Sequence, residues 1–338
     1  MNRKLRLGII LFILALFLLA CFAVCLVIII VPSVIFGRQN INIYPDPVYT
    51  ASDDYLHFLV VGDQGRANAD QVSVAKSMGD YCDRVKKCSF VIGVGDNIYD
   101  YGVGSATDEQ FATKFENIYS QYNGTKNLPW KLMLGNHDYR NNPNAQIQYK
   151  SSLWDLPAYY YIFNKTSTLG GFNVSFVVTD TNTFQPDSLM NQQYVKEQSA
   201  FKQDQLNMIE SVLKENYGKT NTWSIVLGHH PVYSAGIHGD TTTLIENYLP
   251  LFKKYKLPLY LSGHDHFLNW LKDPNEVTNY VISGGGAGNT RPTVYNKYSS
   301  NVYNDSGFFA VEIQKSFIYM IAMDKNGKEL YKIKIDKP

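Results

Sequence analysis

Five apolar runs in this chain each end in a glycine that is followed directly by aspartate, asparagine or histidine. Glycine at such a point lets the chain turn sharply and brings the backbone close to a ligand. Because ligands of α/β proteins bind beyond the carboxyl ends of the strands, the polar residues are expected to surround one crevice. The residues that follow the five glycines are Asp63, Asp96, Asn136, His229 and His264.

Short apolar runs alternate with longer amphipathic segments after residue 55, which predicts an α/β fold. The predicted strands are residues 55–61, 89–94, 130–134, 174–179, 223–227 and 257–261, and the predicted helices are residues 69–82, 107–121, 200–216 and 243–255. Residues 307–323 and 329–335 alternate in polarity and are expected to be antiparallel strands that close the sheet. Without a break in composition, residues 55–338 are interpreted as one catalytic domain.

The residue types in the predicted crevice indicate metal binding. Carboxylate, amide oxygen and imidazole together are ligands for borderline metals such as Fe, Zn and Mn. His264 and His266 lie two positions apart just after a strand, so their side chains diverge and favour two ions over one. Two ions about 3.5–4 Å apart require a carboxylate between them, and Asp96 is the candidate for that bridge.

The order of the five segments resembles the calcineurin-type metallophosphoesterase superfamily, and the resemblance extends from residue 55 to the end. The segments read Gly-Asp, Gly-Asp-Asn-Ile-Tyr, Gly-Asn-His-Asp, Gly-His-His-Pro and Gly-His-Asp-His. Most members have a metal-binding histidine where this chain has Gly65, whereas Tyr99 stands where purple acid phosphatases have their iron-binding tyrosine. Residues 228–238, 260–268 and 283–289 also resemble the small, mammalian-type tartrate-resistant members.

The resemblance implies a four-layer α/β/β/α sandwich and a binuclear acid phosphatase. Ferric iron would be held by Asp63, Asp96, Tyr99 and His266. A second, divalent ion (Fe, Zn or Mn) would be held by Asp96, Asn136, His229 and His264. His137 and His238 would contact the phosphate or donate a proton to the leaving alcohol. A metal-bound hydroxide would attack the phosphorus of small phosphate monoesters.

Two other functions compete with this interpretation. A phosphodiesterase or nucleotide phosphatase on the same scaffold stays open, although no arginine lies inside a motif and nothing marks a nucleobase pocket. A membrane-tethered binding protein with a vestigial site is disfavoured, because no ligand is missing once Tyr99 replaces the first-motif histidine. The physiological ester, the second metal, the organelle and the oligomeric state are left open by the sequence.

Several polar residues near the motifs receive less specific interpretations. His230 is expected to be a surface histidine, with support of a metal ligand as the alternative, and His57 a structural residue of the first strand. Asp138 is expected to orient His137 or a ligand, in keeping with the partners that surround metal sites. The glycine-rich residues 284–288 lack the lysine of a phosphate-binding loop and are interpreted as a loop at the rim of the site.

Residues 7–36 contain no charged side chain, and about 20 apolar residues suffice to span a bilayer as a helix. This run predicts a transmembrane signal anchor in residues 1–36, followed by a linker in residues 37–54. A cleaved signal and a lipoprotein box ending at Cys21 are less favoured, because the apolar run continues well past that cysteine. Arg3, Lys4 and Arg6 precede the run, so the N-terminus is predicted to be cytoplasmic and the domain extracellular or lumenal (lysosomal, vacuolar or secretory). Cleavage in the linker would release the domain.

Charge and cysteine usage agree with an exported, folded domain. The formal net charge of +1 gives no indication of a nucleic-acid partner. Only Cys82 and Cys88 lie outside the apolar run, and the sequence leaves open whether they form a disulfide or two free thiols. Glycosylation sequons, which predict a glycoprotein, begin at Asn123, Asn164, Asn173 and Asn304.

Overall fold

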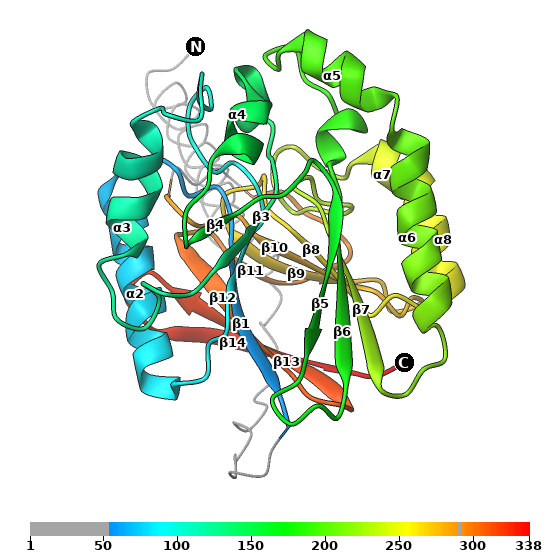
Figure 1. Cartoon of the computed structure of the whole chain (residues 1–338). Helices are drawn as coiled ribbons and strands as arrows, with labels where there is room; N and C mark the ends of the chain where they lie inside the picture. Colours follow the sequence, from blue (N-terminus) through cyan, green and yellow to red (C-terminus); the bar gives the residue numbers. More distant parts are fainter. Residues whose placement is uncertain (1–53, 289–292) are drawn as a thin grey trace, which may run out of the picture. The chain divides into compact units, whose positions relative to one another are not determined.

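The computed structural model describes residues 54–288 and 293–338, which form a mixed α/β fold with two sheets (Figure 1). The first sheet contains β1 (Leu56–Val61), β2 (Val91–Gly93), β3 (Trp130–Leu132), β4 (Trp154–Asp155), β12 (Gly307–Ile313), β13 (Phe317–Asp324) and β14 (Glu329–Asp336). The second contains β5 (Tyr161–Thr166), β6 (Asn173–Val178), β7 (Thr222–Leu227), β8 (Leu259–Ser262), β9 (Leu268–Lys272), β10 (Asn279–Ser283) and β11 (Ser299–Tyr303). The α/β prediction is confirmed, while the predicted membrane anchor and most of the linker lie outside the described residues. Within those residues, no helix has the length and apolar character needed to cross a membrane.

Each sheet has a parallel centre. The first sheet has the order β14-β13-β12-β1-β2-β3-β4, and β1 to β4 run parallel to one another. The second has the order β11-β9-β10-β8-β7-β6-β5, and β6, β7, β8 and β10 run parallel. Parallel strands end at the same edge of a sheet. The loops after β1, β2 and β3 therefore lie at one edge of the first sheet, and the loops after β7 and β8 lie at one edge of the second.

Strand β1 contributes to two hydrophobic cores because both of its faces are covered. Phe58 and Val60 lie in the core between the two sheets, where the Phe58 ring meets Phe176 edge-on at 5.5 Å. Leu59 and Val61 lie in the core beneath helix α2 (Ala69–Val85). Burying one such side chain contributes roughly 1.5–3 kcal/mol. All residues of β1 except His57 are apolar, as is typical of a strand buried on both faces, and this is why the sequence predicted it.

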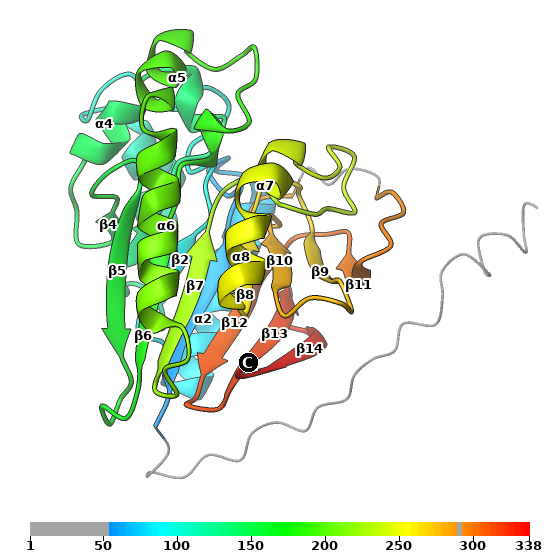
Figure 2. The same cartoon turned by 90° about the vertical axis from the view of Figure 1, so that its right-hand side faces the viewer.

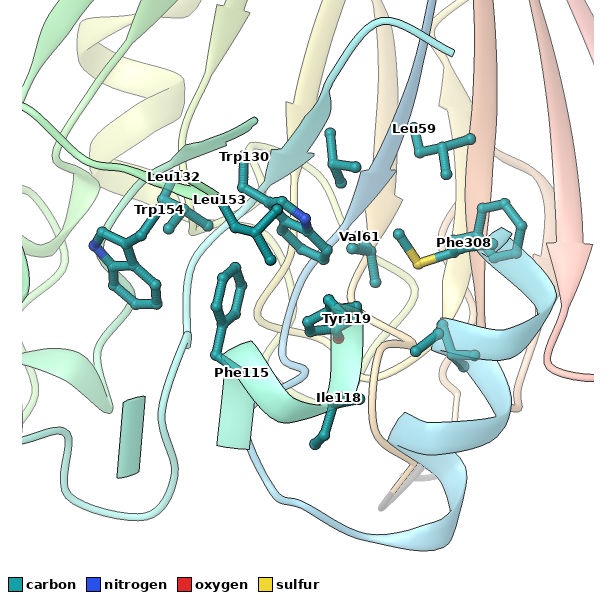
Figure 3. Close-up of a cluster of buried hydrophobic side chains, with 14 of the residues drawn as sticks. Leu59, Val61, Phe115, Ile118, Tyr119, Trp130, Leu132, Leu153, Trp154 and Phe308 are labelled. Atoms are coloured by element: carbon teal, nitrogen blue, oxygen red, sulfur yellow. The ribbon is translucent and has the colours of Figure 1, made fainter. Parts of the chain in front are cut away.

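Aromatic side chains dominate the core on the outer face of the first sheet (Figure 3). Trp130 of β3 packs against Phe115 and Tyr119, with ring centroids 5.0 and 4.3 Å apart. A third core lies between the second sheet and the helices α6 (Lys202–Asn216) and α8 (Leu249–Tyr255), which cover that sheet (Figure 2). Helices thus lie on the outer faces of both sheets.

Two predicted helices differ from the structure. Residues 243–255 form α7 (Thr242–Asn247) and α8, because Pro250 cannot donate a backbone hydrogen bond and lies in the first turn of the second helix. Residues 107–121 form only a π-helical turn (Ala112–Glu116) and the short α3 (Asn117–Tyr119). The predicted single segment 307–323 is a hairpin of β12 and β13.

Several short elements were not predicted at all. They are α4 (Pro143–Gln148), α5 (Gln192–Ser199), β4, β5, β9, β10 and β11. Strand β5 exposes every second residue and lies at the edge of its sheet, so few of its side chains carry a burial signal. Strands β9 and β11 carry buried Asn269 and Asn301, which obscure the apolar alternation.

Cys82 and Cys88 form a disulfide, which decides between the two alternatives that the sequence left open. The bond joins the last turns of α2 to the segment that leads into β2, across a sequence separation of 6 residues. The chain-entropy estimate for so short a loop is about 2 kcal/mol.

We therefore expect the Cys82→Ser/Cys88→Ser double variant to have a free energy of unfolding that is lower by about 2 kcal/mol, and so to unfold at a lower urea concentration. Reduction of the wild type should reproduce the shift and leave the variant unchanged; an unaltered midpoint in both would contradict the prediction.

Candidate metal centre

All nine residues predicted for the site come together at the carboxyl ends of the parallel strands. Asp63 follows β1, Asp96 follows β2, Asn136 follows β3, His229 follows β7, and His264 follows β8. Asp63, Asp96 and His229 are each at most 1% exposed. Above them lies a cavity of about 360 Å³, lined by Asp96, Asn136, His137, Arg140, Gln185, Asp187, Ser188, Leu189, His230, His238, His264 and His266.

The first group of predicted ligands surrounds the Tyr99 hydroxyl. This oxygen lies 3.0 Å from Asp63 Oδ1, 2.7 Å from Asp96 Oδ2 and 3.0 Å from His266 Nε2. One ligand atom from each of Asp63, Asp96 and His266 lies within 4.8 Å of the others. Four side chains that sequence analysis assigned to one ion therefore point at a single buried position.

The second group surrounds the side-chain oxygen of Asn136. Asn136 Oδ1 lies 3.1 Å from His229 Nε2 and 3.2 Å from His264 Nδ1. Asp96 connects this group to the first, because its Oδ1 lies 3.5 Å from His229 Nε2 while its Oδ2 accepts from Tyr99. The two oxygens of one carboxylate thus face two separate sets of ligand atoms.

The donor set fits a cation better than it fits a network of hydrogen bonds. Tyr99 has one hydroxyl proton, which can serve only one of the two carboxylates beside it, and the remaining lone pairs face each other in a buried space. Burial and the negative charges of Asp63 and Asp96 raise the pKa of Tyr99 well above its usual value. A phenolate at this position therefore requires positive charge nearby, which a bound metal ion supplies.

Neighbouring groups bias two of the predicted ligands, Asp96 and His264, toward the forms that bind metals. Burial opposes ionisation of Asp96, but the adjacent His229 and His137 outweigh it and hold the pKa of Asp96 at about 2. Burial and the surrounding histidines lower the pKa of His264 well below its usual value. The carboxylate is accordingly ionised and the imidazole of His264 neutral, with a lone pair available to a metal.

Three of the predicted ligands have a backbone conformation that is uncommon outside glycine. The φ angles of Asp63, Asp96 and His264 are 61°, 54° and 70°. This left-handed region costs free energy for residues with a side chain, and it persists where the surroundings enforce it. Each of the three residues directly follows the glycine of its motif, so the turn that places the side chain is made by both residues.

Two of the motif glycines are required by close approach of a ligand side chain. A Cβ atom on Gly135 would lie 2.1 Å from Asp96 Oδ1. A Cβ atom on Gly95 would lie 2.5 Å from His229 Nδ1, and Gly95 itself has a φ of 93°. The glycines therefore allow the motif loops to lie directly against the ligands of neighbouring loops.

We expect Gly135→Ala to weaken metal binding by about 10- to 100-fold, the loss seen when the support of a metal ligand is disturbed. The added methyl group would displace Asp96 Oδ1, which the second group of ligands shares. Metal content after dialysis against a chelator measures the effect. Gly104→Ala is the matched control, because its Cβ would meet only the Asn141 side chain at 3.7 Å. Equal metal retention in both variants would contradict the prediction.

Asp138 supports the loops of the site without lining the cavity. Its carboxylate accepts hydrogen bonds from the backbone N–H groups of Gly135, Asn97 and Ile98 at 2.8–3.1 Å, and from the side chain of Gln146 at 2.8 Å. Burial, together with the charge of Asp96, raises the pKa of Asp138 to about 7. The residue joins the loop after β2 to the loop after β3 through residues next to Asp96 and Asn136, and the expectation that it orients His137 or a ligand stays a prediction.

His137 and His238 both line the cavity, and each ring packs on a different predicted ligand. The His137 ring packs on Tyr99 at 4.2 Å between centroids, and its Nδ1 lies 2.8 Å from the Asp100 carbonyl oxygen. Burial lowers the pKa of His137. The His238 ring packs on His264 at 4.4 Å, and its Nδ1 lies 2.7 Å from Asp265 Oδ1. Each imidazole is thus held at one nitrogen, and both rings line the cavity.

The sequence missed four further residues of the site. His230 is only 3% exposed and lines the cavity, so the expectation of a surface histidine is wrong. Arg140 also lines the cavity, two residues after a motif, and the guanidinium of Arg66 lies 3.7 Å from the centroid of the Tyr99 ring. Arg140 lies two residues after Asp138 and Arg66 lies three residues after Asp63, and this closeness to a motif is the signal that could have identified them.

The fourth residue, Asp187, comes from a segment without a motif. Its Oδ2 accepts a hydrogen bond of 3.0 Å from the side-chain nitrogen of Asn136. This bond orients the amide so that its oxygen faces His229 and His264. No pattern in the sequence indicates this contact. His57, by contrast, is buried in β1 between Tyr81 and Glu312, as expected of a structural residue.

Comparisons with known proteins agree with this arrangement. Residues 56–268 match the family described as calcineurin-like phosphoesterase. Tartrate-resistant acid phosphatase type 5 of Sus scrofa is 31% identical over 332 residues, which cover 91% of this chain and 93% of that protein. Purple acid phosphatase 4 of Arabidopsis thaliana is 32% identical over 324 residues, covering 93% of this chain and 91% of the relative.

Solved structures show the same fold at lower sequence identity. GAP50, the anchor in the inner membrane complex of Plasmodium, superimposes with a TM-score of 0.73 at 24% identity and covers 85% of this chain and 90% of its own. The purple acid phosphatase of yellow lupin seeds superimposes with a TM-score of 0.60 at 16% identity and covers 85% of this chain and 55% of its own. The predicted family and the predicted phosphate-ester hydrolase are confirmed by the family match and the curated relatives. This chain belongs to the purple acid phosphatases of the calcineurin-like phosphoesterase family.

Proposed function

We propose that this chain is a membrane-anchored acid phosphatase that hydrolyses phosphate monoesters at a binuclear metal centre. The observation that carries the proposal is the position of Asp96, whose two carboxylate oxygens face two separate sets of ligand atoms. A bridging carboxylate is what two like-charged ions need if they are to lie side by side. The names of the acid phosphatase relatives support the monoester substrate.

The residues present fit two different ions. Asp63, Asp96, Tyr99 and His266 would hold ferric iron, since phenolate and carboxylate ligands suit a hard, highly charged ion. Asp96, Asn136, His229 and His264 would hold a divalent ion such as Fe, Zn or Mn. Ions bound in both positions would lower the pKa of water and neutralise charge on the phosphoryl group. Phosphate binding and protonation of the leaving alcohol are assigned to the side chains around the cavity.

His137 and His238 are proposed to bind the phosphate and to protonate the leaving alcohol. The Nδ1 atom of His137 is engaged by the Asp100 carbonyl, so its other nitrogen is directed to the cavity side. Asp265 orients His238 in the same way through Nδ1. Arg140 adds a positive charge to the cavity lining, where it would attract an anionic ester.

The proposed location is a single-pass membrane protein with its catalytic domain in an extracellular or lumenal compartment. The uncharged residues 7–36 and the preceding Arg3, Lys4 and Arg6 support that topology. The Cys82–Cys88 disulfide supports an oxidising compartment. The asparagines of all four glycosylation sequons (Asn123, Asn164, Asn173 and Asn304) are exposed, as a glycoprotein requires.

The deciding experiment is metal analysis of the full-length chain purified in detergent, with a visible spectrum and hydrolysis of p-nitrophenyl phosphate across pH. About two metals per chain, one of them iron, with a purple band and acid activity, are expected. Two metals without iron would keep a phosphoesterase but remove the ferric assignment, whereas a chain that binds no metal would overturn the proposal. Faster hydrolysis of bis-p-nitrophenyl phosphate than of the monoester would favour the phosphodiesterase alternative.

Protease applied to the cytoplasmic side of sealed vesicles should leave the catalytic domain uncut. Digestion of the domain from that side would reverse the proposed topology.

A further inference from the structure

His230 is a buried imidazole in the cavity wall that has no role in the ligand set or in the proposed proton transfers. It follows the predicted ligand His229 and is 3% exposed. Its ring packs on the ring of His264 at 4.5 Å and on that of His229 at 5.1 Å. His238 packs on His264 as well, at 4.4 Å. His230 and His238 are therefore both neighbours of one predicted ligand of the second ion, and both line the cavity.

The hydrogen bonds of His230 hold its ring at Nδ1. Thr181 Oγ1 accepts a hydrogen bond of 3.0 Å from the backbone N–H of His230. The same oxygen lies 2.9 Å from His230 Nδ1, to which the threonine hydroxyl can donate. A hydroxyl that donates to Nδ1 leaves the proton of a neutral imidazole on Nε2.

The surroundings keep this ring fixed in direction. Tyr260 donates a hydrogen bond of 2.7 Å to the backbone carbonyl of His230, so the backbone is held at both its N–H and its carbonyl. Among residues 54–288 and 293–338, no protein acceptor lies within hydrogen-bond distance of Nε2. The Nε2 atom, on the side of the ring away from Thr181, is thus left to donate to a molecule in the cavity.

We propose that His230 is a substrate-binding residue, whose Nε2–H donates a hydrogen bond to an oxygen of the phosphate ester, and that Thr181 positions it. The inference rests on the proposed function, because it places the ester in the cavity above the predicted ligands. Phosphate oxygens are strong acceptors, to which an imidazole N–H can donate. His230 and His238 would then contact the ester from the side of His264, while His137 contacts it from the side of Tyr99.

The test compares two substitutions that each keep one half of the imidazole. His230→Asn keeps a polar group near the position of Nδ1, beside Thr181, but leaves nothing at the position of Nε2. His230→Gln places an amide N–H near the position of Nε2. Inorganic phosphate is titrated calorimetrically into the metal-loaded, full-length chain in detergent, and KM, kcat and metal content are measured on the same samples.

His230→Asn is expected to weaken phosphate binding by about 10- to 100-fold, the usual loss for a hydrogen bond to a charged group. KM should rise with it while kcat changes less, because the bond forms in the ground state as well as in the transition state. His230→Gln should recover most of the affinity, and Thr181→Val should lose part of it because the ring is then free to change tautomer. Metal content should stay at the wild-type level in all three.

Equal phosphate affinity in the wild type and His230→Asn would overturn the inference. So would a loss of affinity that appears only where metal is also lost, because the ring would then act through His264. The binding measurement does not depend on turnover. A wild type that binds phosphate but hydrolyses no monoester would overturn the proposed function while the His230 comparison is still decided, and a metal-loaded wild type that binds no phosphate would overturn both.

Discussion

Asp96→Asn should lower kcat/KM by about 1,000-fold or more and remove both metal ions from the chain. The expected size follows from the loss of a preorganised electrostatic group, which alone costs about 100- to 1,000-fold. Asp96 accepts from Tyr99 through one oxygen, and its other oxygen faces His229 and accepts from the backbone of His137. An amide in its place has only one acceptor oxygen and presents N–H groups to one of the two ligand sets.

Metal content and kcat/KM are measured on the same sample, and the melting temperature shows whether the fold is kept. Asp336→Asn is the matched control, because that carboxylate is exposed on β14 and pairs only with the nearby Lys334 among the described residues. The control should retain both ions and full activity. An Asp96→Asn protein with two ions and near-normal kcat/KM would show that Asp96 does not bridge them.

Tyr99→Phe should abolish the visible charge-transfer absorption of the iron-loaded chain and leave the fold intact. The phenolate oxygen is the atom that would bind ferric iron, whereas the ring has separate packing partners. The Arg66 guanidinium lies 3.7 Å above the ring centroid, and the His137 ring lies 4.2 Å away. Phenylalanine keeps both contacts, so the loss of colour should come without a large loss of stability.

The visible spectrum and the melting temperature measure the two halves of this prediction. Tyr139→Phe is the matched control, since Tyr139 is also fully buried and its hydroxyl also donates to a carboxylate, that of Asp180. The control should keep its colour. A Tyr99→Phe protein that stays coloured would remove Tyr99 from the iron ligands.

The sequence by itself predicted which polar side chains come together because the signals for them are local. A glycine and a polar residue at the end of an apolar run are adjacent in the chain, and parallel strands bring such ends to one edge of a sheet whatever the helices between them do. Asp63, Asp96 and His264 were therefore predictable without knowledge of the loops. The strands that carry them were predicted from apolar runs, as for β1, whose faces are both buried and whose residues except His57 are apolar.

The tertiary structure alone decided which other side chains join the site. Asp187 reaches Asn136 from 51 residues away and without a motif. His230 follows a predicted ligand in the sequence, but the direction of its ring depends on Thr181, which lies in the turn after β6, and on packing against His264. Contacts between distant loops leave no period or spacing in the sequence, because they depend on how both sheets pack. The motifs specify the residue type and the chain position of each predicted metal ligand. The groups that orient these ligands are brought next to them only by the three-dimensional arrangement.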